Sequence, residues 1–219
     1  MSRDSENRAE PSHAAADPVR GEVWLNVAAG LSVLSWAFLG LRHSWLESGQ
    51  IGVVRICCTA IHLTVGTLFL TRRPLLAEGS YAQLALAMPS FIAGGLAFRW
   101  SPPGVEWWPP AIALFALGTV LTIAALLTLG RSFAVLPALR EVVVRGPYRW
   151  VRHPAYAFET LLVVAMVTAT MEWRSLLALL VFLPSVAMRI RAEEQVLGQS
   201  ADYLSYRERV PWRLVPGVW

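Results

Sequence analysis

Four apolar runs of about 20 residues fill most of the chain before position 130, and they leave few choices for the fold. They cover 23–41, 51–70, 81–98 and 109–129. A helix of about 20 apolar residues crosses the ~30 Å hydrocarbon core of a bilayer. Of the 219 residues, 55% are hydrophobic and only 16% are charged, and a water-soluble domain of this size could not bury so much apolar surface. We therefore expect an all-α, polytopic integral membrane protein with four full transmembrane helices.

Two shorter apolar runs follow at 155–171 and 175–188, separated only by Glu172-Trp173-Arg174. So short a connection predicts an antiparallel C-terminal transmembrane hairpin whose arms pack together against the first four helices. We divide the chain accordingly into a disordered cytoplasmic tail (1–21), N-terminal transmembrane helices (22–108) and a core that carries the motifs (109–219).

The basic residues are 19 arginines with no lysine, and their distribution predicts the orientation. With the N-terminus in the cytoplasm, fifteen arginines lie in cytoplasmic segments and three in outer loops. This bias follows the positive-inside rule and predicts a multi-pass protein of a bacterial inner membrane with both termini cytoplasmic. Because the arginines flank apolar runs, we expect contacts with membrane lipids and no nucleic-acid partner.

The segment before the hairpin carries the first group of candidate site residues. Gly146-Pro147-Tyr148 reads as a turn, and Pro154 suits the first position of a helix. His153 then lies just outside that helix and Tyr156 follows one turn later. Helix amides, a histidine, a tyrosine and arginines would bind a polar or anionic cofactor group. An equally simple alternative is that the arginines contact lipid phosphates and the aromatic residues form an interfacial belt.

The segment after the hairpin carries the second group. Arg189 and Glu193 are four residues apart, and the adjacent Glu193 and Glu194 cannot point the same way. Charged residues at membrane depth are functional candidates, although a helix emerging into the cytoplasm with a weak ion pair is the alternative. Glu159, inside the hairpin, needs a cationic partner.

A metal site is not expected. Cys58 and His62 are four residues apart and could supply two ligands, but no second ligand pair is visible in the sequence. Buried packing is the simpler explanation for both side chains.

Together the two segments form a recognisable pattern. LGRSF…RGPYRWVRHPAY followed by RIRAEEQVL…YLSYRERVPWRLVPG resembles the membrane-embedded isoprenylcysteine carboxyl methyltransferases over roughly 110–219. The related phospholipid methyltransferases share the RHP-x-Y and EE pattern. The resemblance implies an integral membrane enzyme that uses S-adenosylmethionine to methylate a lipophilic acceptor.

The resemblance also implies roles for individual residues. Arg189 and Glu193 would lie beside the methyl-accepting group as the catalytic pair. The cofactor-binding residues would be Gly146, Pro147, Tyr148, His153, Tyr156 and Glu194. Phe158 stands where the family usually has glycine.

The expected reaction is carboxyl O-methylation of an isoprenylated cysteine or a related lipophilic acid. N-methylation of a phospholipid amine and S-methylation of a small thiol are alternatives within the same class. A non-enzymatic membrane scaffold or transporter is the alternative from a different class.

Overall fold

The computed structural model describes residues 18–72, 77–78, 81–99, 106–134, 138–139 and 141–219. Its helices are α1 (Pro18–Ser48), α2 (Val53–Thr71), α3 (Tyr81–Arg99), α4 (Pro109–Leu129), α5 (Pro154–Thr170), α6 (Trp173–Leu197) and α7 (Ala201–Arg209). Two short 3-10 helices, η1 (Gly130–Ser132) and η2 (Gly146–Arg149), lie in the connection between α4 and α5. The strands β1 (Ala77–Glu78) and β2 (Ala138–Leu139) form one short antiparallel pair. The expected all-α, polytopic fold is confirmed.

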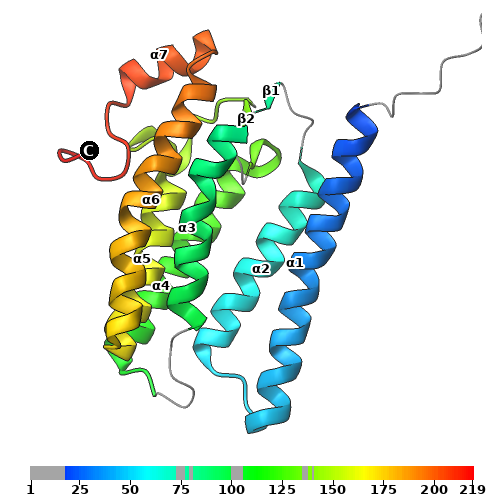
Figure 1. The fold of residues 1–219 in the computed structure, drawn as a ribbon, viewed down its shortest axis with the longest axis vertical. Helices are drawn as coiled ribbons and strands as arrows, with labels where there is room; N and C mark the ends of the chain where they lie inside the picture. Colours follow the sequence, from blue (N-terminus) through cyan, green and yellow to red (C-terminus); the bar gives the residue numbers. More distant parts are fainter. Residues whose placement is uncertain (1–17, 73–76, 79–80, 100–105, 135–137, 140) are drawn as a thin grey trace, which may run out of the picture.

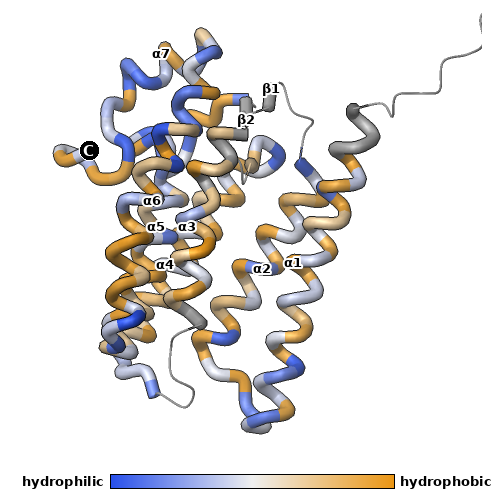
Figure 2. Tube along the Cα trace, viewed as in Figure 1, coloured by the Kyte–Doolittle hydropathy of each residue, from blue (hydrophilic) through white to orange (hydrophobic). Residues whose placement is uncertain are grey.

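Four helical stretches among the described residues are long and apolar enough to cross a membrane. They are Val23–Ser48, Val53–Thr71, Pro109–Ser132 and Trp173–Leu197, and Met88–Ala97 and Pro154–Thr170 are shorter apolar stretches. The run 81–98 was predicted as a full span, but its described residues contribute only the shorter stretch, whereas the second hairpin arm, predicted to be short, is long enough to cross. Large apolar side chains point outward along these helices, and Trp24, Trp36 and Phe38 of α1 are each more than 60% exposed. Figure 2 shows apolar residues along the length of the helices and polar residues gathered at their ends. Such an apolar outer surface suits contact with lipid tails.

The structure differs from the sequence-based expectations at several boundaries. The first apolar run was predicted to end at residue 41, but α1 continues to Ser48. The second hairpin arm was predicted to end at residue 188, but α6 continues to Leu197. The polar residues after Met188 stay helical because partners on other helices accommodate their charges, as described below. The tail was predicted to extend to residue 21, but α1 begins at Pro18, and positions 1–17 of that tail lie outside the described residues.

The helices run alternately up and down and form two groups (Figure 1). Helices α1 and α2 pair with each other, and α2 contacts the second group mainly through α4. In the second group α3 packs along α6 and α4 along α5, while α5 and α6 contact each other less extensively. The hairpin arms therefore pack mostly against α3 and α4 rather than against one another.

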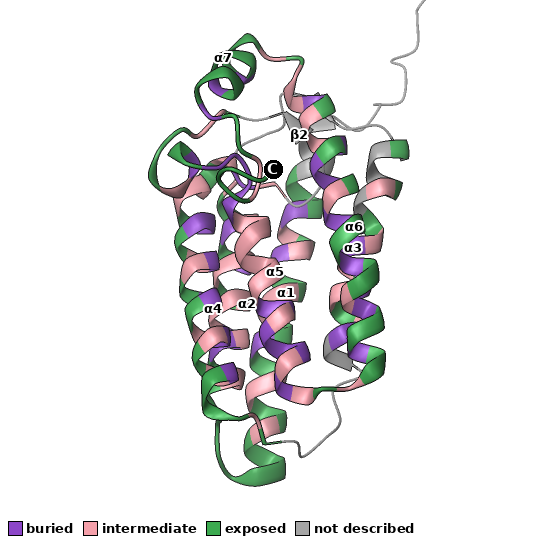
Figure 3. Ribbon diagram, turned by 90° about the vertical axis from the view of Figure 1, so that its left-hand side faces the viewer, coloured by how far each residue is buried: buried purple, intermediate pink, exposed green. Residues whose placement is uncertain are grey.

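Buried side chains fill the spaces between these helices. One core cluster joins α3, α5 and α6 around Met166, Phe182 and Ile190, and another joins α2, α4 and α5 around Phe115 and Leu162. Figure 3 shows the buried positions on faces turned toward neighbouring helices. The polar connection between α4 and α5, the helix α7 and the C-terminal residues gather at the end of the bundle where α1 begins (Figure 1). This end carries the candidate site.

Candidate active site

The start of α5 is positioned by an unusual connection. Gly146 has φ +58°, and a Cβ there would lie 3.1 Å from the Thr128 side chain, so glycine is needed for both reasons. Pro147 begins η2, which places the Tyr148 side chain in the interior with 5% exposure. Pro154 then starts α5, where its missing amide hydrogen leaves no gap in the helical hydrogen bonds. The predicted turn and helix start are both present.

A cluster of charged and polar side chains surrounds Glu194 of α6. Glu194 Oε1 accepts hydrogen bonds from Arg152 Nε at 2.8 Å and Tyr203 Oη at 3.1 Å, and lies 3.2 Å from His153 Nε2. Its second oxygen, Oε2, accepts a hydrogen bond from Arg213 Nε at 2.8 Å. We call Glu194, Arg152, His153, Tyr203 and Arg213 the Glu194 cluster. It ties together α5, α6, α7 and the C-terminal residues.

Residues 210–219, which we call the C-terminal strap, bind the same connection through the backbone. The amides of Arg152 and His153 donate to the carbonyls of Trp212 and Arg213, each at 2.9 Å. Arg152 also donates through its terminal nitrogen Nη1 to the carbonyls of Val210 and Pro211, both at 2.8 Å. The segment that leads into α5 is thus held on one side by Glu194 and on the other by the strap.

Glu193 points in a different direction from Glu194, as their adjacency predicts. Tyr156 Oη donates a hydrogen bond to Glu193 Oε2 at 2.6 Å, and His153 Nδ1 lies 3.9 Å from the same oxygen. The rings of His153 and Tyr156 stack with 5.7 Å between centroids and 10° between planes. Glu193 is therefore fixed by the two aromatic residues at the start of α5.

Arg189 is almost completely buried, with 4% of its surface exposed, and lies beside two aromatic rings. Its guanidinium carbon is 4.0 Å from the Phe91 ring centroid and 4.5 Å from that of Tyr156. Its nitrogen Nη1 lies 3.8 Å from Glu159 Oε2 and 3.5 Å from Ser90 Oγ. The N–H groups of a guanidinium point outward along its planar edge, so polar groups meet Arg189 along that edge. The cationic partner that Glu159 requires is Arg189.

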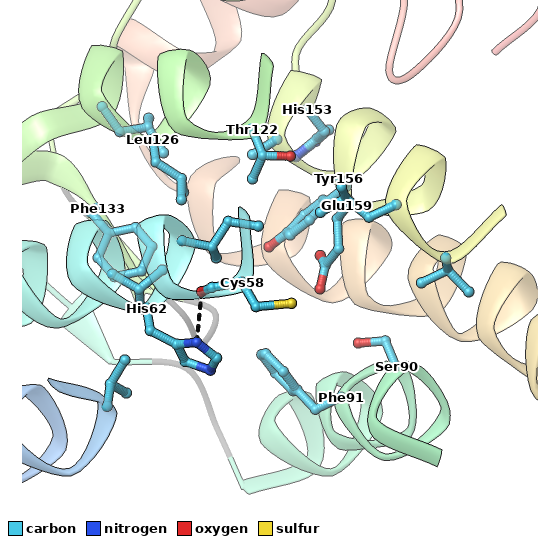
Figure 4. A pocket seen from close by; sticks show the side chains of 18 of the residues that line it. Cys58, His62, Ser90, Phe91, Thr122, Leu126, Phe133, His153, Tyr156 and Glu159 are labelled. Atoms are coloured by element: carbon cyan, nitrogen blue, oxygen red, sulfur yellow. Dashed lines mark hydrogen bonds between the residues drawn. The ribbon is translucent and has the colours of Figure 1, made fainter. Parts of the chain in front are cut away.

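These side chains border a large cavity of about 1560 Å³ between the two groups of helices. Five of the eight predicted site residues line it, namely Tyr148, His153, Tyr156, Arg189 and Glu193. Gly146, Pro147 and Glu194 are not among the described lining residues and instead support the wall from behind. Figure 4 shows Tyr156 and Glu159 projecting toward the cavity from one side and Ser90 and Phe91 facing them from another.

Two buried hydroxyl groups on the cavity wall have no hydrogen-bond partner among the described residues. They belong to Tyr148 and to Thr122 of α4. Burial raises the pKa of the Tyr148 phenol well above its ordinary value, and the negative charges of Glu193 and ionised Tyr206 would raise it further. Tyr148 therefore keeps its proton at neutral pH and can donate it to a ligand. Unpaired buried hydroxyl groups favour a ligand that completes their hydrogen bonds.

Cys58 and His62 also line the cavity, on the side formed by α2. The His62 Nδ1 atom lies 2.7 Å from the Cys58 carbonyl oxygen, so this contact stays within the helix (Figure 4). Among the described residues no group of three or more metal-ligating side chains forms.

Sequence reasoning missed several residues that build the site. Arg152 lies within the RHP motif and Arg213 within the C-terminal motif, so their positions could have indicated a role. Ser90, Phe91 and Thr122 carry no recognisable local pattern, since they reach the site only through the packing of α3 and α4.

Comparison with known proteins adds independent information. Residues 110–200 match the family model described as phospholipid methyltransferase. The chain is also 30% identical over 171 residues to protein-S-isoprenylcysteine O-methyltransferase B of Arabidopsis thaliana. That alignment covers 71% of this chain and 82% of the plant protein. The family-model match contains the whole hairpin together with Tyr148, His153, Tyr156, Arg189 and Glu193.

Proposed function

The chain belongs to the membrane methyltransferase family that contains the isoprenylcysteine and phospholipid methyltransferases, and from this premise we propose that it transfers a methyl group from S-adenosylmethionine to the carboxylate of a lipophilic acceptor. The observation that carries the acceptor assignment is the buried guanidinium of Arg189 at the cavity wall, beside the rings of Phe91 and Tyr156. The edge of a guanidinium matches the two oxygens of a carboxylate.

The residues on the cavity wall fit S-adenosylmethionine. Tyr148 and Thr122 offer unpaired hydroxyl groups, and Glu193 offers a carboxylate for a cationic group of the cofactor. His153 and Tyr156 complete the polar wall, while Gly146 and Pro147 hold Tyr148 in place. Glu194 acts through His153 and Arg152 rather than by direct contact.

When bound, S-adenosylmethionine would supply a methyl group whose carbon an acceptor oxygen attacks in line, while the C–S bond breaks and the neutral thioether S-adenosylhomocysteine leaves. A carboxylate acceptor needs no proton removed, so the protein contributes mainly by alignment. Arg189 holds the acceptor carboxylate, and the rings of Phe91 and Tyr156 restrict how the guanidinium can turn. Glu193 fixes Tyr156 through their 2.6 Å hydrogen bond and thereby positions one of those rings.

Methylation of a phospholipid amine is the second candidate, and one observation favours it. Two carboxylates, Glu159 and Glu193, line the cavity near Arg189. Carboxylates at a cavity wall would attract a cationic headgroup. In that case Glu193 would contact the acceptor and Arg189 would be less important.

We further propose that the end of the bundle with the Glu194 cluster faces the cytosol. The arginine-rich connection between α4 and α5, α7 and the C-terminal strap gather there (Figure 1). This orientation follows the positive-inside rule and would admit a polar cofactor from water while a lipophilic acceptor enters from the bilayer.

A radiolabelled methyl-transfer assay on purified protein tests the proposal. The acceptor panel contains a prenylcysteine analogue, phosphatidylethanolamine, a fatty acid and a small thiol. A base-labile product from a carboxylate acceptor is the expected result, and a base-stable, lipid-extractable product would favour the amine. No binding of S-adenosylmethionine at millimolar concentration would overturn the enzymatic proposal altogether.

A further inference from the structure

One of the arginines that line the cavity, Arg55, lies away from the candidate active site. Arg55 is the third residue of α2, half-buried, and lies within the apolar stretch Val53–Thr71. An ionised side chain in a membrane span is costly and usually marks a binding or transport function. The chemistry proposed above makes no use of Arg55.

The Arg55 side chain is held against α1 rather than directed away from the protein. Its Nε donates a hydrogen bond to Ser44 Oγ at 3.3 Å. A Cβ at Gly40 would lie 2.8 Å from the Arg55 terminal nitrogen Nη1, so the guanidinium occupies space that only glycine leaves open. An arginine side chain that only extended toward the membrane surface would not need to pack against Gly40 and Ser44 of α1.

The charge of Arg55 is not neutralised within the described part of the chain. Its described side-chain hydrogen bond goes to a neutral hydroxyl, and no carboxylate there lies within ion-pair distance. Glu106 lines the same end of the cavity, but it is exposed and makes no described ion pair with Arg55. A cation at a cavity wall without an acidic partner favours an anionic ligand.

The cavity is long enough to connect the two arginines. Polar residues line it at both ends, whereas Val54, Ile61, Phe115, Leu162 and Val163 form apolar wall between them. Its volume of about 1560 Å³ exceeds the ~300–1,000 Å³ of a pocket for one small ligand. There is room for a cofactor and, in addition, for a lipid chain.

Helix geometry gives the separation of the two ends. Helices α2 and α6 begin at the same end of the bundle (Figure 1), Arg55 is two residues from the start of α2, and Arg189 is sixteen from the start of α6. At 1.5 Å per residue, Arg189 lies about 20 Å further from the start of its helix than Arg55 does from the start of α2. This distance corresponds to a long, extended hydrocarbon chain.

We propose that Arg55, with Ser44, forms a second anion-binding subsite that holds an anionic oxygen group of an amphiphile whose hydrocarbon chain lies in the cavity. Either of two molecules can supply that group. One is an acceptor that carries a second acidic group and whose other end meets Arg189, and the other is a bilayer phospholipid with its phosphate. The proposal goes beyond the methyl-transfer reaction and does not depend on it.

Binding measurements on the full chain without S-adenosylmethionine test this subsite. The probes are hexadecanedioic acid and hexadecanoic acid, which differ only in the second carboxyl group. In parallel, protein in vesicles of phosphatidylcholine and phosphatidylglycerol is extracted, and the retained phospholipid is counted by native mass spectrometry. The variants are Arg55→Gln, Arg55→Lys and, as matched control, Arg42→Gln, which removes an exposed arginine from the same end of the bundle.

If the second acidic group is the ligand, the wild type and Arg42→Gln bind the diacid about 10-fold or more tightly than the monoacid. Arg55→Gln then binds both acids equally, and Arg55→Lys keeps part of the preference. If a bilayer phosphate is the ligand, the two acids bind equally to the wild type, but Arg55→Gln loses a phosphatidylglycerol that Arg42→Gln retains.

The proposal is overturned if Arg55→Gln matches the wild type both in the diacid preference and in retained phospholipid. Thermal unfolding of Arg55→Gln shows whether the variant is folded, and Arg55→Lys provides a second test that keeps the charge. Because none of these measurements uses methyl transfer, a failure of the proposed reaction would not be confused with a failure of the subsite.

Discussion

Replacing Glu194 with glutamine separates a structural role from direct cofactor binding. Glutamine keeps the shape of the side chain but removes the charge that faces Arg152 and Arg213. Only 4% of the Arg152 side chain and 9% of the Glu194 side chain are exposed, so water cannot replace the lost carboxylate. Removing one partner of a buried ion pair costs about 3–5 kcal/mol. We expect the free energy of unfolding to fall by about this amount.

The consequence should be largest in the C-terminal strap. Arg213 loses its acceptor, and Arg152, which also binds the carbonyls of Val210 and Pro211, loses the group that orients it. Limited proteolysis in detergent should therefore cut residues 210–219 of Glu194→Gln faster than those of the wild type. The melting temperature should fall by several degrees, and the affinity for S-adenosylmethionine should fall with it.

Glu208→Gln is the matched control, since it removes an exposed acidic group from the neighbouring helix α7. It should leave stability and proteolysis as in the wild type. If Glu194→Gln had wild-type stability and an equally protected strap, our account of the cluster would be refuted. A loss of cofactor affinity alone would then assign Glu194 to the cofactor itself.

Four further expectations follow from the site and the topology. Arg189→Lys should not retain normal turnover, because lysine keeps the charge but loses the flat edge; wild-type turnover would exclude a carboxylate clamp. Tyr148→Phe should weaken binding of S-adenosylmethionine about 10-fold or more without lowering stability, since its hydroxyl has no partner in the described structure; equal affinities measured by calorimetry would contradict this. Burial raises the pKa of Tyr206 to about 12, although the charge of Arg152 acts to lower it, whereas a tyrosine in the unfolded chain titrates near pH 10. The contribution of Tyr206 to the free energy of unfolding is therefore complete below about pH 10 and is lost as the pH rises toward 12. Tyr206→Phe should reduce this loss in alkaline unfolding curves. In a background without the two native cysteines, an impermeant thiol reagent on intact cells should label Glu47→Cys and not Glu78→Cys, and the reverse pattern would invert the topology.

The transmembrane architecture was largely predictable, because run length and hydropathy report directly on a chain that lies in lipid. The end of the second hairpin arm was not. Arg189, Glu193 and Glu194 look like the start of a cytoplasmic segment, yet α6 continues through them. Their charges are stabilised by Glu159, Tyr156 and the Glu194 cluster. Such compensation between distant parts of the chain leaves no local signal.

The candidate site, too, could be predicted from the sequence only in part. His153 and Tyr156 could be placed at a helix start because Pro154 marks it. The aromatic cover on Arg189 could not be predicted, since Phe91 lies almost a hundred residues away in the sequence and reaches Arg189 only through the packing of α3 along α6. Spacing within a motif indicates which residues share an element, but not which side chains from other elements face them.

The docking of the C-terminal strap has a consequence for biosynthesis. Residues 210–219 follow every described transmembrane helix in the chain, so the ribosome makes them after all of those helices. Until then Arg152 and His153 lack the carbonyls of Trp212 and Arg213, and Glu194 lacks one of its two arginines. A nascent chain already threaded into the bilayer therefore has an unfinished wall around the cavity. Translation must proceed through the strap before that wall is complete.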